Sequence, residues 1–358
     1  MTDQELMLSV IVPVYNGSKY VPQLVQSILA NNDLVKLGIE VILVNDGSQD
    51  NTEEVCREIS LKQRNIVYVQ KANGGIASAR NFGLGLARGR YITFADQDDR
   101  LIDKNGYVQY LQQCLDGNLD ILYTSPYYIN DRCEKPQKRT FEDRFIDDVS
   151  LIRKMAGKLI DAKYLSNDEA PSVSTSVWNA FYRKEMLDEH RITFKVFIDY
   201  EDDWIFNIET LMAAERVAIT SRGYYCWVIR GTSESHRTKY IPNLLEKRKL
   251  WMEWVTDIAK KLDTDESVIH SYLENVLRPR NIMMCFNNAC WKPETDKEEI
   301  LNEIRQAIGD GGWSIKAVSL MKVDEMDKLN RLLLLLLKHH CINAAYYLNI
   351  CLFKKRFH

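Results

Sequence analysis

The chain has 358 residues, 46% of them hydrophobic, and a formal net charge of −3. This length allows one large domain or two modest ones with a full core, and disorder is not the expected state. A pI near 6.1 argues against a protein that binds nucleic acid through a broadly basic surface.

The eight cysteines include no C-x-x-C pair, so we expect reduced thiols. The N-terminal MTDQELML carries acids and no basic segment before a long apolar stretch, so we expect a cytoplasmic protein.

Short apolar runs rich in Val and Ile alternate with helix-length segments in the first third of the chain. Such runs are typical of strands buried on both faces of a parallel sheet. They cover residues 8–14, 39–45, 66–70, 91–95 and 119–124. The segments 18–31 and 50–62 between them predict helices. This βαβαβ order predicts an α/β fold, a mostly parallel sheet flanked by helices, over residues 5 to about 125.

Polar residues gather where three of the predicted strands end. The first strand is followed by YNG at 15–17, the second by DGS at 46–48 and the fourth by DQDD at 96–99. Ligands of such sheets bind outside the carboxyl ends of the strands. The three loops therefore predict one shared crevice.

The DQDD segment places three carboxylates in four positions, which is unfavourable without a nearby cation. A D-x-D pair after a strand can bind Mg²⁺ or Mn²⁺ through one carboxylate, because these ions take oxygen ligands and keep positions open for phosphate. The alternative is a solvated turn in which Asp99 caps the following segment.

The rest of the chain is less regular and then helical. Asp202 and Asp203 begin a predicted helix, and acids are common there because the exposed N–H groups favour them. From about residue 240 onward the chain predicts helices. The tail, 329–358, has no acid and several Lys and Arg among Leu, Tyr and Phe. Its apolar run is too short to span a bilayer. It predicts either a helix lying on the cytoplasmic face of the membrane or a helix packed on the protein body.

Four segments together resemble the family 2 glycosyltransferases, which are inverting enzymes of GT-A fold that use nucleotide-diphosphate sugars. They are SVIVPVYNGSKYV, EVILVNDGSQDNT, QKANGGIASARNFGLGLARGRYITFADQDD, and DYEDDWIFNIE followed by RGTSES. The resemblance covers about residues 7–236. It implies a Rossmann-like catalytic domain at 1–236, with a nucleotide-sugar-binding part at 1–125 and an acceptor part at 126–236. Residues 237–358 would form a helical C-terminal region with a basic amphipathic tail.

The resemblance assigns the nucleotide to the first two loops. It places Pro13 and Tyr15 where the base and ribose pack, and Asp46 where a carboxylate accepts from the imide N–H of uracil. These roles suit the residues, because Tyr offers a flat apolar face and Asp recognises a donor edge. The alternative for Asp46 is an Asx turn.

The same resemblance extends the donor site along the chain. It implies that Asn73, Gly74 and Arg80 lie beside the nucleotide, that Asp96 contacts the ribose, and that Asp98 binds Mn²⁺ or Mg²⁺.

The acceptor hydroxyl needs a base, because an alcohol is a poor nucleophile until its proton is being removed. The family places an acidic pair in DYEDDWIF, which leaves Asp203 and Asp202 as candidates. The register of the apolar positions that follow favours Asp203. The alternative is a pair of helix N-terminal acids without a catalytic role.

Three more residues are assigned around the reacting groups. Arg230 and His236 resemble the stretch that neutralises the leaving diphosphate, where cations stabilise growing charge. Trp178 is a candidate for stacking on an acceptor sugar, although a core position is the preferred interpretation of a single Trp.

The resemblance implies transfer of a sugar from a UDP-sugar to a hydroxyl of a glycan or lipid-linked glycan, with inversion, in bacterial surface polysaccharide or capsule synthesis. One rival is a sugar nucleotidyltransferase, which would need a Gly-rich basic loop where this chain has VYNGSKY. The other is a catalytically silent nucleotide-binding scaffold of a membrane assembly complex. The intact acids at 96, 98, 202 and 203 argue against the scaffold.

Overall fold

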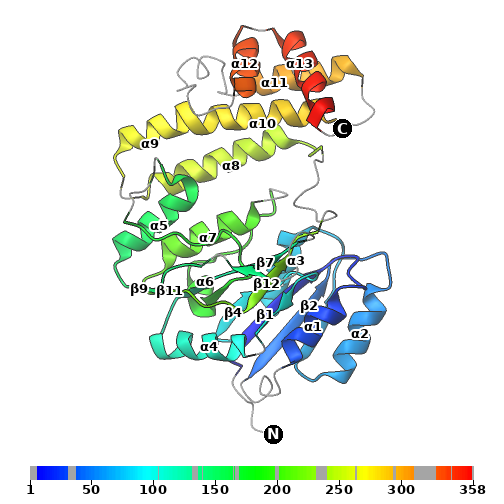
Figure 1. Cartoon of the computed structure of the whole chain (residues 1–358), viewed down its shortest axis with the longest axis vertical. Helices are drawn as coiled ribbons and strands as arrows, with labels where there is room; N and C mark the ends of the chain where they lie inside the picture. The colour runs from blue at the N-terminus through cyan, green and yellow to red at the C-terminus, as the bar shows by residue number, and fades with distance from the viewer. Residues whose placement is uncertain are drawn as a thin grey trace. The chain divides into compact units, whose positions relative to one another are not determined.

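The computed structural model of the chain divides into two compact units, Met1–Ser233 and Glu234–His358. The sequence predicted a division after residue 236. The structure describes residues 6–30, 38–103, 105–130, 136–138, 140–163, 165, 169–197, 201–230, 240–262, 264–292, 296–309, 328–339 and 341–356. Figure 1 follows both units from the N-terminus in blue to the C-terminus in red.

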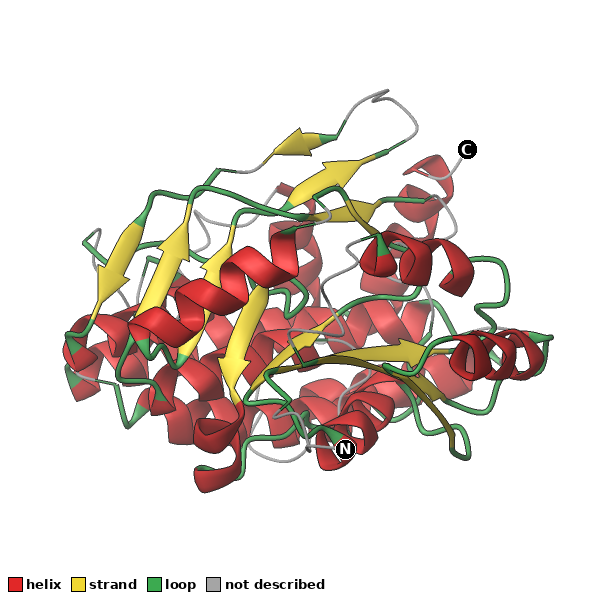
Figure 2. Ribbon diagram, turned by 90° about the horizontal axis from the view of Figure 1, so that it is seen from below, coloured by secondary structure: helices red, strands yellow, loops and turns green. Residues whose placement is uncertain are grey.

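The first unit is built on a large mixed sheet. Among the described residues it has eight strands in the order β3-β2-β1-β4-β10-β6-β11-β9. Figure 2 shows these strands side by side. Their bounds are β1 Leu8–Val14, β2 Ile39–Asn45, β3 Ile66–Gln70, β4 Tyr91–Phe94, β6 Ile121–Thr124, β9 Arg144–Ile146, β10 Ala180–Arg183 and β11 Val217–Thr220.

The parallel core of this sheet confirms the α/β prediction, and β10 modifies it. Strands β1, β2, β3 and β4 pair in parallel, as do β6 and β11. Strand β10 lies antiparallel between β4 and β6. The fifth predicted strand is therefore separated from the fourth by a strand that comes later in the chain, so residues 1–125 and 126–236 share one sheet.

Helices cover both faces of the sheet. Their bounds in the first unit are α1 Val21–Leu29, α2 Thr52–Lys62, α3 Ile76–Leu86, α4 Gly106–Gly117, α5 Val149–Asp161, α6 Lys184–Glu189 and α7 Asp202–Ala213. Helices α1, α2 and α4 share a core with alternate residues of β1, such as Val10 and Val12. Helix α3 packs on the opposite face, where an added Cβ at Gly83 would lie 2.4 Å from the Ile11 side chain. The close approach of α3 to β1 thus requires glycine.

A smaller sheet lies beside the site. In the described part of the chain it has four strands in the order β5-β12-β7-β8. Their bounds are β5 Arg100–Leu101, β7 Tyr127–Ile129, β8 Gln137–Lys138 and β12 Tyr225–Val228. Strand β5 follows the DQDD segment directly, so this sheet anchors the far side of that loop.

The second unit is helical where it is described, as the sequence predicted. Its helices are α8 Leu244–Ala259, α9 Glu266–Tyr272, α10 Arg278–Cys290, α11 Lys297–Gly309, α12 Lys328–Lys338 and α13 Ile342–Arg356, with a π-helical turn Leu273–Leu277 between α9 and α10. Helix α12 buries Leu333, Leu334 and Leu337, whereas Leu332 and Leu335 are 46% and 47% exposed. No helix among the described residues is both long and apolar enough to cross a bilayer.

Candidate active site

The loops that follow β1, β2 and β4 meet at the carboxyl edge of the large sheet. Gln97 joins the first and the last of them: its Oε1 accepts from the Tyr15 N–H at 3.0 Å and its Nε2 donates to the Tyr15 carbonyl at 2.9 Å. The Asn16 N–H donates to Ser48 Oγ at 2.9 Å. An added Cβ at Gly17 would lie 2.0 Å from Gln97 Oε1, so this contact needs glycine. The three loops predicted to form one crevice are therefore in contact with one another.

The two residues predicted to pack on the nucleotide differ in exposure. Tyr15 is 44% exposed, whereas Pro13 is buried inside β1. Pro13 lies beyond the last residue pair between β1 and β4, so its missing N–H removes no hydrogen bond between these two strands. Of the two, Tyr15 is the residue that presents a ring at the surface of the crevice.

Asp46 is held by donors from its own chain. Its carboxylate accepts from the Gly74 N–H at 3.0 Å and the Gly75 N–H at 2.7 Å, and it pairs with Lys71 Nζ at 2.6 Å. Asn73 Nδ2 donates to the Asp46 carbonyl at 2.9 Å. Asp46 thus fixes the segment 71–75 that was predicted to lie beside the nucleotide. A carboxylate has about four acceptor positions, so an imide N–H would share Asp46 with these donors.

The turn in NDGS is made by a different residue from the one considered in the sequence. Asn45 Oδ1 accepts from the Ser48 N–H at 3.0 Å and from Ser48 Oγ at 2.6 Å. Asn45 therefore makes the local turn bonds, and Asp46 faces the 71–75 segment.

Arg80 is a buried counter-ion for three acids. Its side chain is 2% exposed; Nη1 lies 2.8 Å from Asp202 and also contacts Asp203, while Nη2 lies 3.1 Å from Asp96. The guanidinium also lies 5.2 Å from the ring centroid of Phe194. The Nη1 and Nη2 donors of Arg80 therefore face acids of its own chain, and the nucleotide-binding role of Arg80 stays a prediction.

Neighbouring Asn81 has a related structural task that the sequence reasoning missed. Its Nδ2 donates to the Phe194 carbonyl and its Oδ1 accepts from the Phe194 N–H, both at 2.8 Å. Asn81 thereby ties α3 to the segment that carries Phe194. Arg80 and Asn81 thus bind Asp202, Asp203 and Phe194, which lie more than 100 positions further along the chain.

The two candidate bases have different environments. The Asp203 side chain is 25% exposed and that of Asp202 is 7% exposed. Burial raises the pKa of Asp203 to about 7, against the opposing effect of Arg80, and the nearby Asp202 and Asp96 charges add to the rise. One guanidinium cannot neutralise three carboxylates, so a proton on Asp203 relieves the excess charge. Asp203 is accordingly the more accessible acid and the one poised near neutral pH.

The predicted metal ligand lies beside the predicted diphosphate ligand. Asp98 Oδ2 is 2.8 Å from Arg230 Nη1, and the two side chains are 30% and 25% exposed. The Arg230 guanidinium also lies 4.9 Å from the Tyr20 ring centroid. The structure therefore brings these two assignments together. His236 lies outside the described residues.

The donor set at Asp98 fits a metal held jointly with a ligand. No group of three or more His, Cys, Asp or Glu side chains among the described residues could hold a metal by itself. Mg²⁺ is commonly bound through one or two carboxylates plus substrate phosphates rather than by a protein cage. Asp98 offers an accessible carboxylate of that kind, next to a cation suited to phosphate oxygens.

Trp178 lies in the core. Its side chain is 6% exposed and stacks on the Tyr225 ring at a centroid distance of 4.7 Å. This burial favours the core interpretation over stacking on an acceptor sugar.

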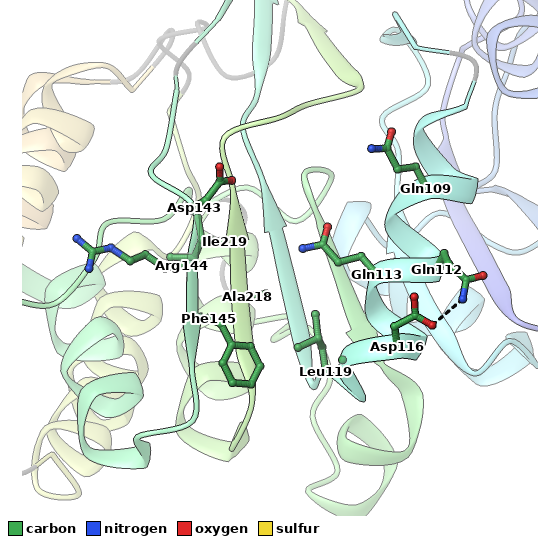
Figure 3. A pocket seen from close by; sticks show the side chains of 11 residues that line it. Gln109, Gln112, Gln113, Asp116, Leu119, Asp143, Arg144, Phe145, Ala218 and Ile219 are labelled. Atoms are coloured by element: carbon green, nitrogen blue, oxygen red, sulfur yellow. Dashed lines mark hydrogen bonds between the residues drawn. The ribbon is translucent and has the colours of Figure 1, made fainter.

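A hollow of about 910 Å³ lies elsewhere on the first unit. Figure 3 shows its walls, formed by α4 with Gln109 and Gln113 and by the β9–β11 side with Phe145. The described residues that line it include none of the predicted site residues. The chemistry of the loops, and not the size of this hollow, identifies the candidate site.

The fold and the site together define a glycosyltransferase of the GT-A class. Glycosyl transferase family 2 matches residues 9–191, and the chain belongs to this family. The crystal structure of S. aureus TarS residues 1–349 in complex with UDP-GlcNAc is similar in fold, with a TM-score of 0.62 and 20% sequence identity, and the match covers 98% of this chain and 92% of that one.

Curated relatives agree with this assignment. The chain is 28% identical over 221 residues to the uncharacterized glycosyltransferase EpsJ of Bacillus subtilis, which covers 62% of this chain and 60% of EpsJ. It is 49% identical over 92 residues to the minor teichoic acid biosynthesis protein GgaB of Bacillus subtilis, which covers 25% of this chain and 10% of GgaB. The chain thus spans less than two thirds of both relatives. It belongs to a glycosyltransferase family and is similar over part of its length to a teichoic acid biosynthesis protein.

Proposed function

We propose that the protein transfers a sugar from a UDP-sugar to a hydroxyl of a glycan or lipid-linked glycan, with inversion, during synthesis of a bacterial surface polysaccharide. The observation that carries this proposal is the contact between three strand-end loops, which carry Tyr15, Asp46 and Asp98. Asp203 of α7 shares the Arg80 guanidinium with Asp96 of the third loop. The relation to GgaB supports an acceptor of the surface-polymer class.

The donor nucleotide would lie along the loops after β1 and β2. Tyr15 would stack on the base or ribose, Asp46 would accept from the imide N–H of uracil, and Asp96 would accept from the ribose hydroxyls. Structures of S. aureus TarS in complex with UDP-GlcNAc and with UDP support a uridine nucleotide in this fold.

The diphosphate would lie between Asp98 and Arg230. Mn²⁺ or Mg²⁺ held by Asp98 would stabilise the charge on the diphosphate. Arg230, which pairs with Asp98 at 2.8 Å, would donate to phosphate oxygens as charge grows on the leaving group.

Asp203 would act as the general base of a single in-line displacement. The acceptor oxygen forms its bond to the anomeric carbon while the bond from that carbon to the diphosphate oxygen breaks. Asp203 takes the hydroxyl proton, and UDP leaves with the bonding electron pair. Asp202, which is 7% exposed against Arg80, would hold the guanidinium in place.

The test compares Asp203→Asn and Asp98→Asn with Asp116→Asn, which changes an exposed carboxylate of α4. We expect UDP release from a panel of UDP-sugars with a teichoic acid or glycan acceptor to fall at least about 100-fold in both of the first two variants. This is the usual scale for a lost general base at Asp203, and loss of the metal ligand Asp98 removes several kcal/mol of charge stabilisation. The α4 variant should match the wild type. Unchanged turnover in both site variants would reject the mechanism. A wild type that binds UDP and turns over no sugar would favour the scaffold.

We further propose that α12 contacts an anionic membrane surface. Leu332 and Leu335 are exposed on this helix while its other face is buried, and no acid follows Asp327 in the sequence. Exposed Leu with flanking cations suits the interface of an anionic bilayer. The alternative, a tail only packed on the body, is tested by the same experiment.

The vesicle experiment uses a matched surface leucine as its control. The double variant Leu332→Ser/Leu335→Ser should bind phosphatidylglycerol vesicles about tenfold more weakly than the wild type, since about 1.4 kcal/mol of apolar burial is lost. Leu61→Ser removes an 88% exposed leucine from α2 in the other unit and should change nothing. Equal binding by all three proteins would leave the tail as a packed helix.

A further inference from the structure

A buried tyrosine hydroxyl joins the acidic loop after β4 to β12. Tyr225 OH donates to Asp99 Oδ2 at 2.8 Å and accepts from the Asp96 N–H, also at 2.8 Å. Tyr225 is fully buried, with 0% exposure, and Asp99 is 3% exposed. The bond between Tyr225 and Asp99 therefore lies where water cannot replace it, and losing the hydroxyl would leave the Asp99 carboxylate without this donor.

Strand β12 holds the same loop at two further points. The Val228 N–H donates to Asp99 Oδ1 at 2.8 Å, and Arg230, two residues further on, pairs with Asp98 at 2.8 Å. Tyr225 and Val228 of β12 thus both bind Asp99, and Arg230, just after the strand, binds the adjacent Asp98. The loop position and the position of Arg230 are set by the same strand.

The neighbours of Tyr225 fix the direction of its hydroxyl. Its ring stacks on Trp178 with an interplanar angle of 19°, and such a pair stabilises the ring in this orientation. Trp178 therefore supports the Tyr225 ring from its position in the core. The hydroxyl is the polar tip of an otherwise apolar stack, and it is directed at the loop.

We propose that Tyr225 is a positioning residue for the donor diphosphate. Its hydroxyl holds the loop that carries Asp96 and Asp98 in register with Arg230, so that one diphosphate can reach both Asp98 and the guanidinium. Tyr225 does not touch the substrate; it acts through Asp99 and the Asp96 backbone. This inference rests on the proposed function, because it assumes that a nucleoside diphosphate binds here.

The experiment compares Tyr225→Phe with Tyr91→Phe. Each variant keeps a buried ring and removes a hydroxyl that makes two hydrogen bonds; Tyr91 OH donates to the carbonyls of Cys114 and Leu119, both at 2.9 Å. Tyr91 begins β4 and Asp96 follows its end, so the two hydroxyls lie at opposite ends of one strand. Both variants should lower Tm, since each loses a buried hydroxyl with two partners, and Tyr225→Phe should lower it more because one of its partners is a carboxylate.

Only Tyr225→Phe should change nucleotide binding. We expect calorimetry with UDP and Mn²⁺ to give a Kd about tenfold higher for Tyr225→Phe and unchanged for Tyr91→Phe. In turnover, KM for the donor should rise while KM for the acceptor stays the same. If Tyr225→Phe does not fold, Asp99→Asn replaces it, because it alters the same hydrogen bond from the other side.

The outcomes separate this inference from the proposed function. A wild type that does not bind UDP overturns the donor assignment itself. A wild type that binds UDP, with Tyr225→Phe or its substitute binding equally well, overturns the positioning role alone. Equal weakening by Tyr225→Phe and Tyr91→Phe would assign the effect to general loss of stability and would also overturn it.

Discussion

Two acidic regions of the candidate site, Asp46 and the acids around Arg80, differ in how many donors their carboxylates have. Asp46 has donors in excess of its charge: two backbone N–H groups and Lys71. Around Arg80, three carboxylates share a single guanidinium. The first arrangement fixes a loop, whereas the second leaves negative charge that can take a proton. Both regions hold acids away from water and differ in the number of donors: where one guanidinium serves three carboxylates, burial raises the pKa of Asp203 and the neighbouring acids add to the rise.

The largest expected effect comes from removing the shared cation. Arg80→Ala leaves Asp202 and Asp96 without their buried partner, and breaking a buried ion pair from one side costs about 3–5 kcal/mol. Urea unfolding at pH 7 should show this loss. Arg57→Ala removes a 57% exposed partner of Glu53 and should cost at most about 0.5 kcal/mol. Equal losses in the two variants would remove the distinction between the Arg80 cluster and a surface pair.

A smaller effect is expected at the other region. Asp46→Ala leaves the Gly74 and Gly75 N–H groups and Lys71 without their acceptor, which should lower the free energy of unfolding by about 2 kcal/mol. UDP affinity should fall with it, because the 71–75 segment loses its anchor. Asp188→Ala, at a 63% exposed carboxylate paired with Lys184, serves as the control. An Asp46→Ala protein as stable as this control would contradict the anchoring role.

The pH dependence of the Asp203 region provides a third test, with an expected change of about tenfold in kcat/KM. Burial raises the pKa of Asp203 to about 7, so the folded protein keeps a proton that the unfolded chain releases near pH 4. Stability should therefore decline as pH rises from about 4 to about 7, with the decline complete above the folded pKa. Activity should move the other way, because only the ionised carboxylate takes a proton: kcat/KM should rise about tenfold between pH 6 and pH 8.

Two measurements check this opposition. A pH–rate profile should give a rising limb, and urea unfolding at pH 5 and pH 8 should give the larger free energy at pH 5 for this contribution. Asp203→Asn should reduce the difference in unfolding free energy. If the variant and the wild type share one stability profile, the raised pKa of Asp203 is not what makes this region reactive.

Much of the donor half could be predicted from the sequence. The apolar runs at 8–14 and 39–45 coincide with β1 and β2, because strands buried on both faces are mostly apolar. The run at 66–70 coincides with β3, which lies at the edge of the sheet and is only partly buried. The positions of the polar loops could be predicted because each begins where an apolar run ends. The position of β10 could not be predicted, since AFYR at 180–183 is a short segment whose neighbours are set by pairing with residues far along the chain.

The partners within the site were also beyond sequence reasoning. Arg80 lies in a recognisable motif, but its burial depends on α7, 122 positions further along the chain. In the sequence Tyr225 looks like an ordinary strand residue. The structure shows that its hydroxyl lies 2.8 Å from Asp99 Oδ2. Such contacts depend on tertiary geometry, which local spacing does not encode. The sequence can therefore identify the acids, and the fold decides which of them are satisfied.

The antiparallel strand β10 also bears on how the chain reaches its native state. It pairs with β4 and β6. Strand β4, which precedes the acidic loop, therefore gains this neighbour only after Ala180 has been synthesised. A fragment ending at residue 125 would leave β4 as an open edge, with its backbone groups available to other chains. Nucleation must close a long loop before the sheet is continuous, which predicts slow, cooperative folding of the whole first unit.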